Sequence, residues 1–455
     1  MTTSVSVSPG RRLPAPPVHR ARWRSRLEGA TTPARLRLLL VLLVLLSLAW
    51  GVLAALTANQ HASAAADVVA TSEPLSLDAE QIYTSLSDAD ATAANAFLAG
   101  GLEPAAAQQR YHADITEAAI RIEAASALVG STAARTQLPG HLAKQASAAD
   151  SAVGDDLAIL SGQLPAYTDE VGTARADNRL GLPLGAAYLR EASGLLRGTL
   201  LPAASDIYTR ESGLLTSASA QATGLPLMVI TVVVGLGIGY VLYRSSRWLA
   251  RHTHRVVNYG LLLAALVGLV SLVWLAAAFV VGRGDLLHAQ QQGSAPVQAY
   301  ARAEVAALQA HADESLTLID NSGDDAYQQD YLAQQKLLGP GPGTLLAAAQ
   351  TPGGSTVAAD AQAWYQAHAA LRKLDDGGHH AAAVQSALSG DAAAKFARLS
   401  ADLNDGIQTH QAVFASSARS GRDAFTGLAV GMIVAALAMV AGCTWGLSRR
   451  LAEYR

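Results

Sequence analysis

Residues 225–243, LPLMVITVVVGLGIGYVLY, and residues 259–281, YGLLLAALVGLVSLVWLAAAFVV, decide the fold of this chain. Each run is close to the ~20 apolar residues that a helix needs to cross a bilayer. The segment between them, 244–258, reads RSSRWLARHTHRVVN, and short arginine-rich loops of this kind stay on the cytoplasmic side. We therefore predict a transmembrane hairpin whose turn lies in the cytoplasm.

Two further apolar runs, 38–58 and 425–447, complete a set of four predicted spans. A secretory signal is the alternative for the first run, because Ala62-Ser63-Ala64 resembles a cleavage site; the length of the run favours an uncleaved anchor. The chain is thus predicted to be a multi-pass plasma-membrane protein, with segments 59–224 and 282–424 outside the cell.

Charge supports this topology with both termini in the cytoplasm. Arginines concentrate in the arm 1–37, the loop 244–258 and the tail 448–455, whereas only Glu28 and Glu453 of the 36 acidic residues lie there. The proline-containing arm is predicted to be disordered and attracted to the lipid bilayer, at about 1 kcal/mol per basic residue near the surface.

The composition predicts an all-α membrane protein. Half of the residues are hydrophobic but only 5% are aromatic, and alanine and leucine supply the excess. Apolar residues recur at helical spacing, as at Ile115, Ala119 and Ile122, so each outer segment is predicted to be an elongated helical bundle. The sequence leaves open whether the two bundles touch.

Catalytic and transport chemistry are poorly represented. GxSxG, HExxH and P-loop patterns are absent, so we expect no enzyme activity and no cofactor. His379-His380 beside Asp375-Asp376 allow a metal site, but the glycines between them favour an exposed polar turn and no metal. The predicted spans hold no Asp, Glu, Lys, Arg or His, which disfavours a carrier.

The spans contain glycine pairs at four-residue spacing, which permits close helix contact. These pairs favour a packed membrane core, although scattered glycines in lipid-facing helices would look the same. The pairs are Gly235/Gly239, Gly427/Gly431 and Gly442/Gly446.

The stretch 167–197 concentrates charged and aromatic side chains around the turn Gly181-Leu182-Pro183. Such groups suit the binding of a carboxylate or of a protein surface, while salt bridges within the bundle are the alternative. The predicted partner- or ligand-binding residues are Arg175, Asp177, Asn178, Arg179, Tyr188, Arg190 and Glu191.

The central loop is a second candidate site, as a contact for a cytoplasmic effector. Its alternative role is only to fix topology and bind lipid. The residues concerned are Arg244, Arg247, Arg251, His254 and Arg255.

Two spans around a helical outer bundle resemble the sensor half of bacterial chemoreceptors and sensor kinases. Having this unit twice without an output domain is similar to the actinobacterial GlnX-type membrane transducers. Locally, the resemblance rests on 174–179 (ARADNR), 187–193 (AYLREAS) and 249–255 (LARHTHR). It implies that the outer region receives an amino-acid-loaded binding lipoprotein and that the signal reaches a soluble serine/threonine kinase.

The expected function is therefore transmembrane signal transduction without enzymatic activity. A membrane-anchored envelope scaffold and a transporter accessory subunit are the alternatives. We expect no nucleic-acid partner, and a homodimer is compatible with the spans.

Overall fold

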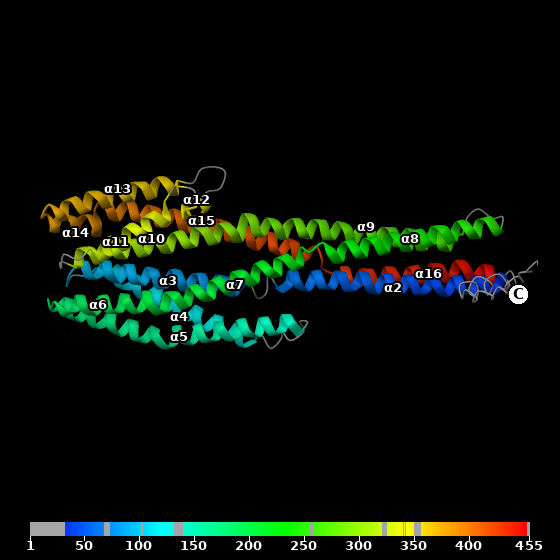
Figure 1. Ribbon diagram of the computed structural model, residues 1–455, viewed down its shortest axis with the longest axis horizontal. Helices are drawn as coiled ribbons and strands as arrows, with labels where there is room; N and C mark the ends of the chain where they lie inside the picture. The colour runs from blue at the N-terminus through cyan, green and yellow to red at the C-terminus, as the bar shows by residue number, and fades with distance from the viewer. Residues whose placement is uncertain are drawn as a thin grey trace, which may run out of the picture. The chain divides into compact units, whose positions relative to one another are not determined.

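The computed structural model contains only helices among the regular elements that it describes (Figure 1). It describes residues 32–67, 73–101, 103–131, 140–253, 258–320, 325–339, 341, 343–349 and 356–452. Most of the predicted arm and the last three residues of the tail lie outside these ranges. Four helices are long and apolar enough to cross a membrane, so the all-α, four-span fold class is confirmed. The predicted domain boundaries remain predictions.

Along the chain, blocks of polar helices lie between apolar helices. In order the elements are α2 (Thr32–Asp67), α3 (Glu73–Leu98), α4 (Ala105–Ser131), α5 (Gly140–Arg179), α6 (Leu184–Leu195), the π-helix η4 (Leu196–Leu200), α7 (Leu201–Ala222), α8 (Pro226–Thr253), α9 (Tyr259–His288), the π-helix η5 (Ala289–Ser294), α10 (Ala295–Ile319), α11 (Ala326–Leu338), α12 (Leu345–Ala349), α13 (Val357–Asp376), α14 (His380–Ser389), α15 (Asp391–Asp423) and α16 (Leu428–Ala452). The polar blocks α3–α7 and α10–α15 lie between the apolar helices α2, α8, α9 and α16.

The chain divides into two compact units. The apolar unit comprises residues 1–57, 226–276 and 427–455, and the polar unit comprises residues 58–225 and 277–426. Helices α2 and α9 each contribute residues to both units. A turn at 424–427, with Gly427 at φ +74°, separates α15 from α16, so the last polar helix and the fourth apolar helix are separate elements.

Large aliphatic side chains cover the outside of the apolar unit, as a helix bundle in lipid requires; Leu38, Leu266 and Val430 are each more than half exposed. Inside it, polar groups find partners within the bundle. Trp50 donates its indole N–H to Ser271 Oγ at 3.2 Å, and the hydroxyls of Thr57 and Thr231 are 2.8 Å apart. Each buried polar group thereby avoids the cost of an unpaired donor in hydrocarbon.

Glycines bring the apolar helices close together. A Cβ on Gly260 of α9 would lie 2.5 Å from the carbonyl oxygen of Gly442 on α16, and Gly446 packs against the same point. Asn258 donates to the Gly446 carbonyl at 3.0 Å, which holds this contact. The predicted pair Gly442/Gly446 thus lies at a helix crossing, whereas a Cβ on Gly239 would meet no atom within 4 Å.

The polar unit has α3 and α10 at its centre, packed against each other (Figure 1). Helix α3 also contacts α4 and α7, and α10 also contacts α11, α12 and α15. Leu316 of α10 belongs to the core of the first segment, and Ala91 of α3 belongs to the core of the second. The two polar segments therefore form one compact unit, which answers a question that the sequence left open.

The glycine contact between α9 and α16 generates a first prediction. Gly260→Ala should destabilise the protein in detergent micelles by about 1–3 kcal/mol, because the added methyl group overpacks a backbone contact. Gly237→Ala is the matched control, since its Cβ would meet nothing within 4 Å. Thermal unfolding followed by tryptophan fluorescence measures both variants, and equal stabilities would contradict the contact.

Candidate functional site

Helix α10 places charged side chains in the middle of the polar unit. It is buried on nearly all sides, and Glu304, Asp313 and Glu314 are each at most 5% exposed. Helix α3 adds the buried carboxylates Glu80 and Asp90 on its own faces. Since burying a charge is costly without a partner, the partners of these groups define the candidate site.

Arg197 of the π-helix η4 binds two of these carboxylates. Its Nε donates to Asp90 Oδ2 at 3.4 Å, and its Nη1 donates to Asp313 Oδ1 in a short contact. Ser193 completes the network by donating to Asp90 Oδ1 at 2.6 Å. The network joins α3 and η4 of the first polar segment to α10 of the second. π-Helical turns of this kind are frequent at functional sites.

Burial shapes the protonation of this network. It raises the pKa of Asp313 to about 6, although Arg197 acts in the opposite direction. The pKa of Arg197 itself is raised, because its two carboxylate partners outweigh the cost of burying its charge. The guanidinium therefore stays charged, and Asp313 titrates near neutral pH.

A second buried network surrounds Glu314. This side chain is fully buried between His368 Nδ1 at 2.7 Å and His311 Nδ1 at 3.4 Å. Burial raises the pKa of Glu314, but the hydrogen-bonded His368 and the neighbouring His311 outweigh burial and lower it to about 2. His311 also pairs with Asn95 of α3 at 3.1 Å, so this network likewise connects the two polar segments.

A groove with a volume of about 980 Å³ lies beside His311. Its floor is formed by small residues of α3, such as Ala91 and Ala96, and its sides come from α4 and α15. On one side Arg110 makes a bidentate ion pair with Asp88, with N–O distances of 2.9–3.1 Å. The groove matches small-molecule sites in size and in its few convergent polar groups.

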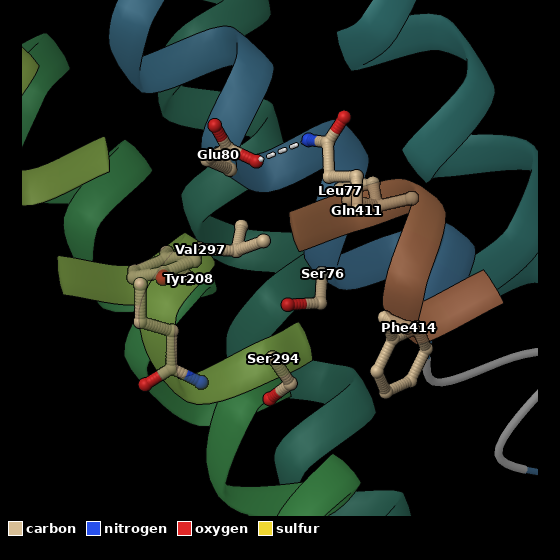
Figure 2. A pocket seen from close by; sticks show the side chains of 9 residues that line it. Ser76, Leu77, Glu80, Tyr208, Ser294, Val297, Gln411 and Phe414 are labelled. Carbon is tan, nitrogen blue, oxygen red and sulfur yellow. Dashed lines mark hydrogen bonds between the residues drawn. The ribbon is translucent and has the colours of Figure 1, made fainter. Parts of the chain in front are cut away.

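A smaller pocket of about 30 Å³ lies where α3, α7, η5, α10 and α15 meet (Figure 2). Glu80 enters it from α3 and accepts a hydrogen bond from Gln411 Nε2 of α15 at 3.2 Å. Burial raises the pKa of Glu80 to about 7, and the bond from Gln411 lowers it only in part. The other lining residues are Ser76, Leu77, Tyr208, Ser294, Val297, Gln298 and Phe414.

The residues predicted around the turn 181–183 mostly bind groups of the same chain. Arg175 is nearly buried, with Nη2 at 3.2 Å from Glu103 Oε1 and its guanidinium 4.1 Å from the ring centroid of Tyr111. Arg179 lies 3.8 Å from the same Glu103, and Asn178 Nδ2 donates to the Phe97 carbonyl at 2.8 Å. The alternative of salt bridges within the bundle thus describes the contacts of Arg175 and Arg179 with Glu103, while Asn178 makes a hydrogen bond within the bundle.

The remaining predicted residues of that stretch have diverse surroundings. Arg190 pairs with Asp320 of α10 at 3.1 Å. Tyr188 packs against the core of the first segment, and Glu191 is exposed. The carbonyl of Asp177 accepts the backbone N–H of Leu182 at 2.9 Å within the turn. A partner-binding role for the set stays a prediction.

The predicted coupling loop is described only at its start. Arg244 and Arg247 lie exposed on α8, and Arg247 donates to the hydroxyl of Tyr243 at 3.2 Å. Arg251 lies in the last turn of α8, while His254 and Arg255 lie outside the described residues.

The motif at 375–380, which the sequence predicts to be an exposed polar turn, contains a contact between two of its own side chains. His380 Nδ1 lies 2.8 Å from Asp375 Oδ1 at an exposed turn. Within the described ranges, no group of three or more His, Cys, Asp or Glu side chains could hold a metal ion.

Sequence reasoning missed the pairing of Arg197 with Asp90 and Asp313, and also the Glu80 pocket. The sequence did contain one signal of buried charge. Glu304, Asp313 and Glu314 interrupt an alanine-rich helix and lie on different faces of it. That pattern shows that some charges must be buried, but it does not identify their partners.

Comparison with known proteins finds one family. Residues 64–220 match the model of an actinobacterial sensor domain, which spans α3 to α7 of the polar unit. Neither the curated proteins nor the solved structures contain a match. The family match supports an actinobacterial sensor protein and a sensing or signalling role, and the four apolar helices indicate a multi-pass membrane protein.

The Arg197 network generates a second prediction. Arg197→Met should destabilise the protein by about 3–5 kcal/mol at pH 7.5, because it leaves Asp90 and Asp313 buried without their cation. Arg210→Met is the matched control: this exposed arginine, 3.8 Å from Asp156 and 3.9 Å from Asp206, should contribute less than about 1 kcal/mol. Denaturant unfolding in micelles, read by far-UV circular dichroism, compares them. A similar loss in both variants would show that the network contributes nothing special.

The pKa of Glu304 generates a third prediction. Burial, with Asp88 and Glu80 nearby, raises it to about 8 from 4.5. Between these values the unfolded chain releases its proton first, so the free energy of unfolding falls as pH rises, by up to about 1.4 kcal/mol per unit. Glu304→Gln cannot ionise and should therefore be more stable than the wild type by at least about 1 kcal/mol at pH 8, with a small difference at pH 5.

Melting temperatures in micelles across pH 5–8 test this expectation. Glu123→Gln serves as an exposed control on α4 and should follow the wild-type curve. A Glu304→Gln curve parallel to the wild type would mean that the carboxylate does not titrate in this range.

Proposed function

We propose that this chain is a non-enzymatic transmembrane signal transducer whose polar unit lies outside the cell. There it would bind a ligand or an amino-acid-loaded binding lipoprotein, and its cytoplasmic surfaces would act on a serine/threonine kinase. The sensor-domain match at 64–220 supports the sensing role. The arginine-rich arm, loop and tail support cytoplasmic termini.

One observation carries the proposal beyond a sensing role. Arg197, within the matched segment, binds Asp313 of the second polar segment, which the match does not cover. A ligand that alters the packing of the first segment therefore also alters the environment of a buried charge in the second. Because an unpaired buried charge costs several kcal/mol, this coupling is large enough to bias two states of the unit.

The relay inward would use helices that the two units share. Helix α2 belongs to the apolar unit up to Thr57 and to the polar unit from Ala58, and α9 changes unit after Ala276. A ligand shifts such a helix only to the extent that it binds the two states with different affinity. Of the predicted loop 244–258, residues 244–253 belong to α8, and α9 begins at Tyr259.

Association with the effector tests the proposal. The full chain, tagged at its C-terminus, is recovered from native membranes of cells grown with or without amino acids, and bound kinase is quantified by mass spectrometry. A transducer should show at least about a fivefold change in bound kinase, the lower range of allosteric coupling. Asp313→Asn is expected to abolish the change while leaving the amount of protein in the membrane comparable.

The alternatives give different results in the same experiment. Constant recovery of the same envelope proteins under all conditions would replace the transducer with a scaffold. Recovery of transporter subunits in place of a kinase would identify an accessory subunit.

A further inference from the structure

The Glu80 pocket contains buried polar groups that the protein itself leaves incompletely satisfied. Tyr208 is 5% exposed, and its hydroxyl has no hydrogen-bond partner among the residues that the structure describes. Glu80 is equally buried and is bonded to the amide of Gln411, which Figure 2 shows reaching across from α15. A buried hydroxyl without a partner costs about 1–3 kcal/mol, so a ligand that satisfies it would be stabilised there.

The size of the pocket limits what can enter. A volume of about 30 Å³ is room for roughly two water-sized groups, since one water needs about 10–15 Å³ by this measure. A free amino acid or a nucleotide is too large.

The charge and shape of the lining further limit the class of ligand that the pocket can bind. Glu80 is the one acidic side chain that lines the pocket, so a single positive charge neutralises it. Ser76, Ser294 and Tyr208 also line the pocket and carry hydroxyls that can accept hydrogen bonds, while Leu77, Val297 and Phe414 are apolar. A divalent ion would require more carboxylate and carbonyl oxygens than this wall provides.

We propose that this pocket binds a small ammonium-type cation, either ammonium itself or a short primary amine such as methylammonium. The N–H groups would donate to the Glu80 carboxylate and to the surrounding hydroxyls, including that of Tyr208. The aromatic rings of Tyr208 and Phe414 suit a cation with a small apolar part. The site is independent of the kinase relay proposed above, because it concerns binding alone.

The position of the pocket gives such binding a structural consequence. Its residues come from α3 and α7 of the first polar segment and from η5, α10 and α15 of the second. Ser294 belongs to η5, whose Gly293 lies so close to Phe414 that a Cβ there would be 2.5 Å away. An occupant would therefore contact both segments at the point where the π-helix and α15 are in tight contact.

Protons compete with the cation for Glu80. Other titratable or charged groups that act on this pocket are Glu304 and Arg302 on α10 and the phenol of Tyr208 on α7; Gln411 on α15 is neutral. Since burial raises the pKa of Glu80 to about 7, the carboxylate is charged above this pH and protonated below it. Affinity should fall about tenfold per pH unit below pH 7 and level off above it.

The test uses the full chain in lipid nanodiscs and isothermal titration calorimetry at constant ionic strength. Methylammonium and ammonium should bind at pH 8, with potassium and sodium at least tenfold weaker and tetramethylammonium excluded by size. Glu80→Gln should lower methylammonium affinity at least tenfold. Tyr208→Phe keeps the ring but removes the hydroxyl and should lower affinity roughly tenfold, as expected for a hydrogen bond to a charged group.

Glu123→Gln is the control, because this exposed carboxyl on α4 does not line the pocket. It should retain methylammonium binding within about threefold. Far-UV circular dichroism confirms that each variant is folded. Equal binding of all monovalent cations, or wild-type affinity in folded Glu80→Gln, would overturn the proposal and leave the pocket to water.

Discussion

The burial of charge between α3 and α10 is the constraint on which the rest of the polar unit depends. Helices α3 and α10 approach closely because alanines lie at their contact. Their carboxylates are therefore removed from water. Arg197 pairs with two of them, and His368 forms a hydrogen bond with Glu314. Because these partners come from different parts of the chain, the pairing fixes which helices are neighbours, a specificity that alanine packing alone provides weakly.

The fold class followed from the sequence because hydropathy and charge segregation are local signals. Runs such as 225–243 are recognisable without any knowledge of their neighbours, and helical periodicity marks the polar helices in the same way. The joining of the two polar segments into one unit is a different kind of property. It depends on contacts such as that of Leu316 with the first core, and no local pattern in α10 shows which surface will cover that residue.

In the candidate site, too, local sequence predicted some features, and others depend on contacts between distant residues. Around Arg175 and Arg179, the sequence indicated a concentration of charge, and the structure pairs both arginines with Glu103, more than seventy residues away. Composition therefore located the charges but could not distinguish an internal ion pair from a docking surface. Glu80 presents the opposite case, since a single glutamate in a helix carries no signal until Tyr208 and Gln411 are brought beside it.

Each polar segment contributes residues to the core of the other, and this determines which part of the chain folds as a unit. The segment that matches the sensor family ends at residue 220, yet its core includes Leu316 and its Arg197 needs Asp313. Excised on its own, that segment would expose an apolar seam along α3 and an arginine with half of its anionic partners. The structure therefore predicts that the two segments unfold together, because each completes the core and the buried ion pairs of the other.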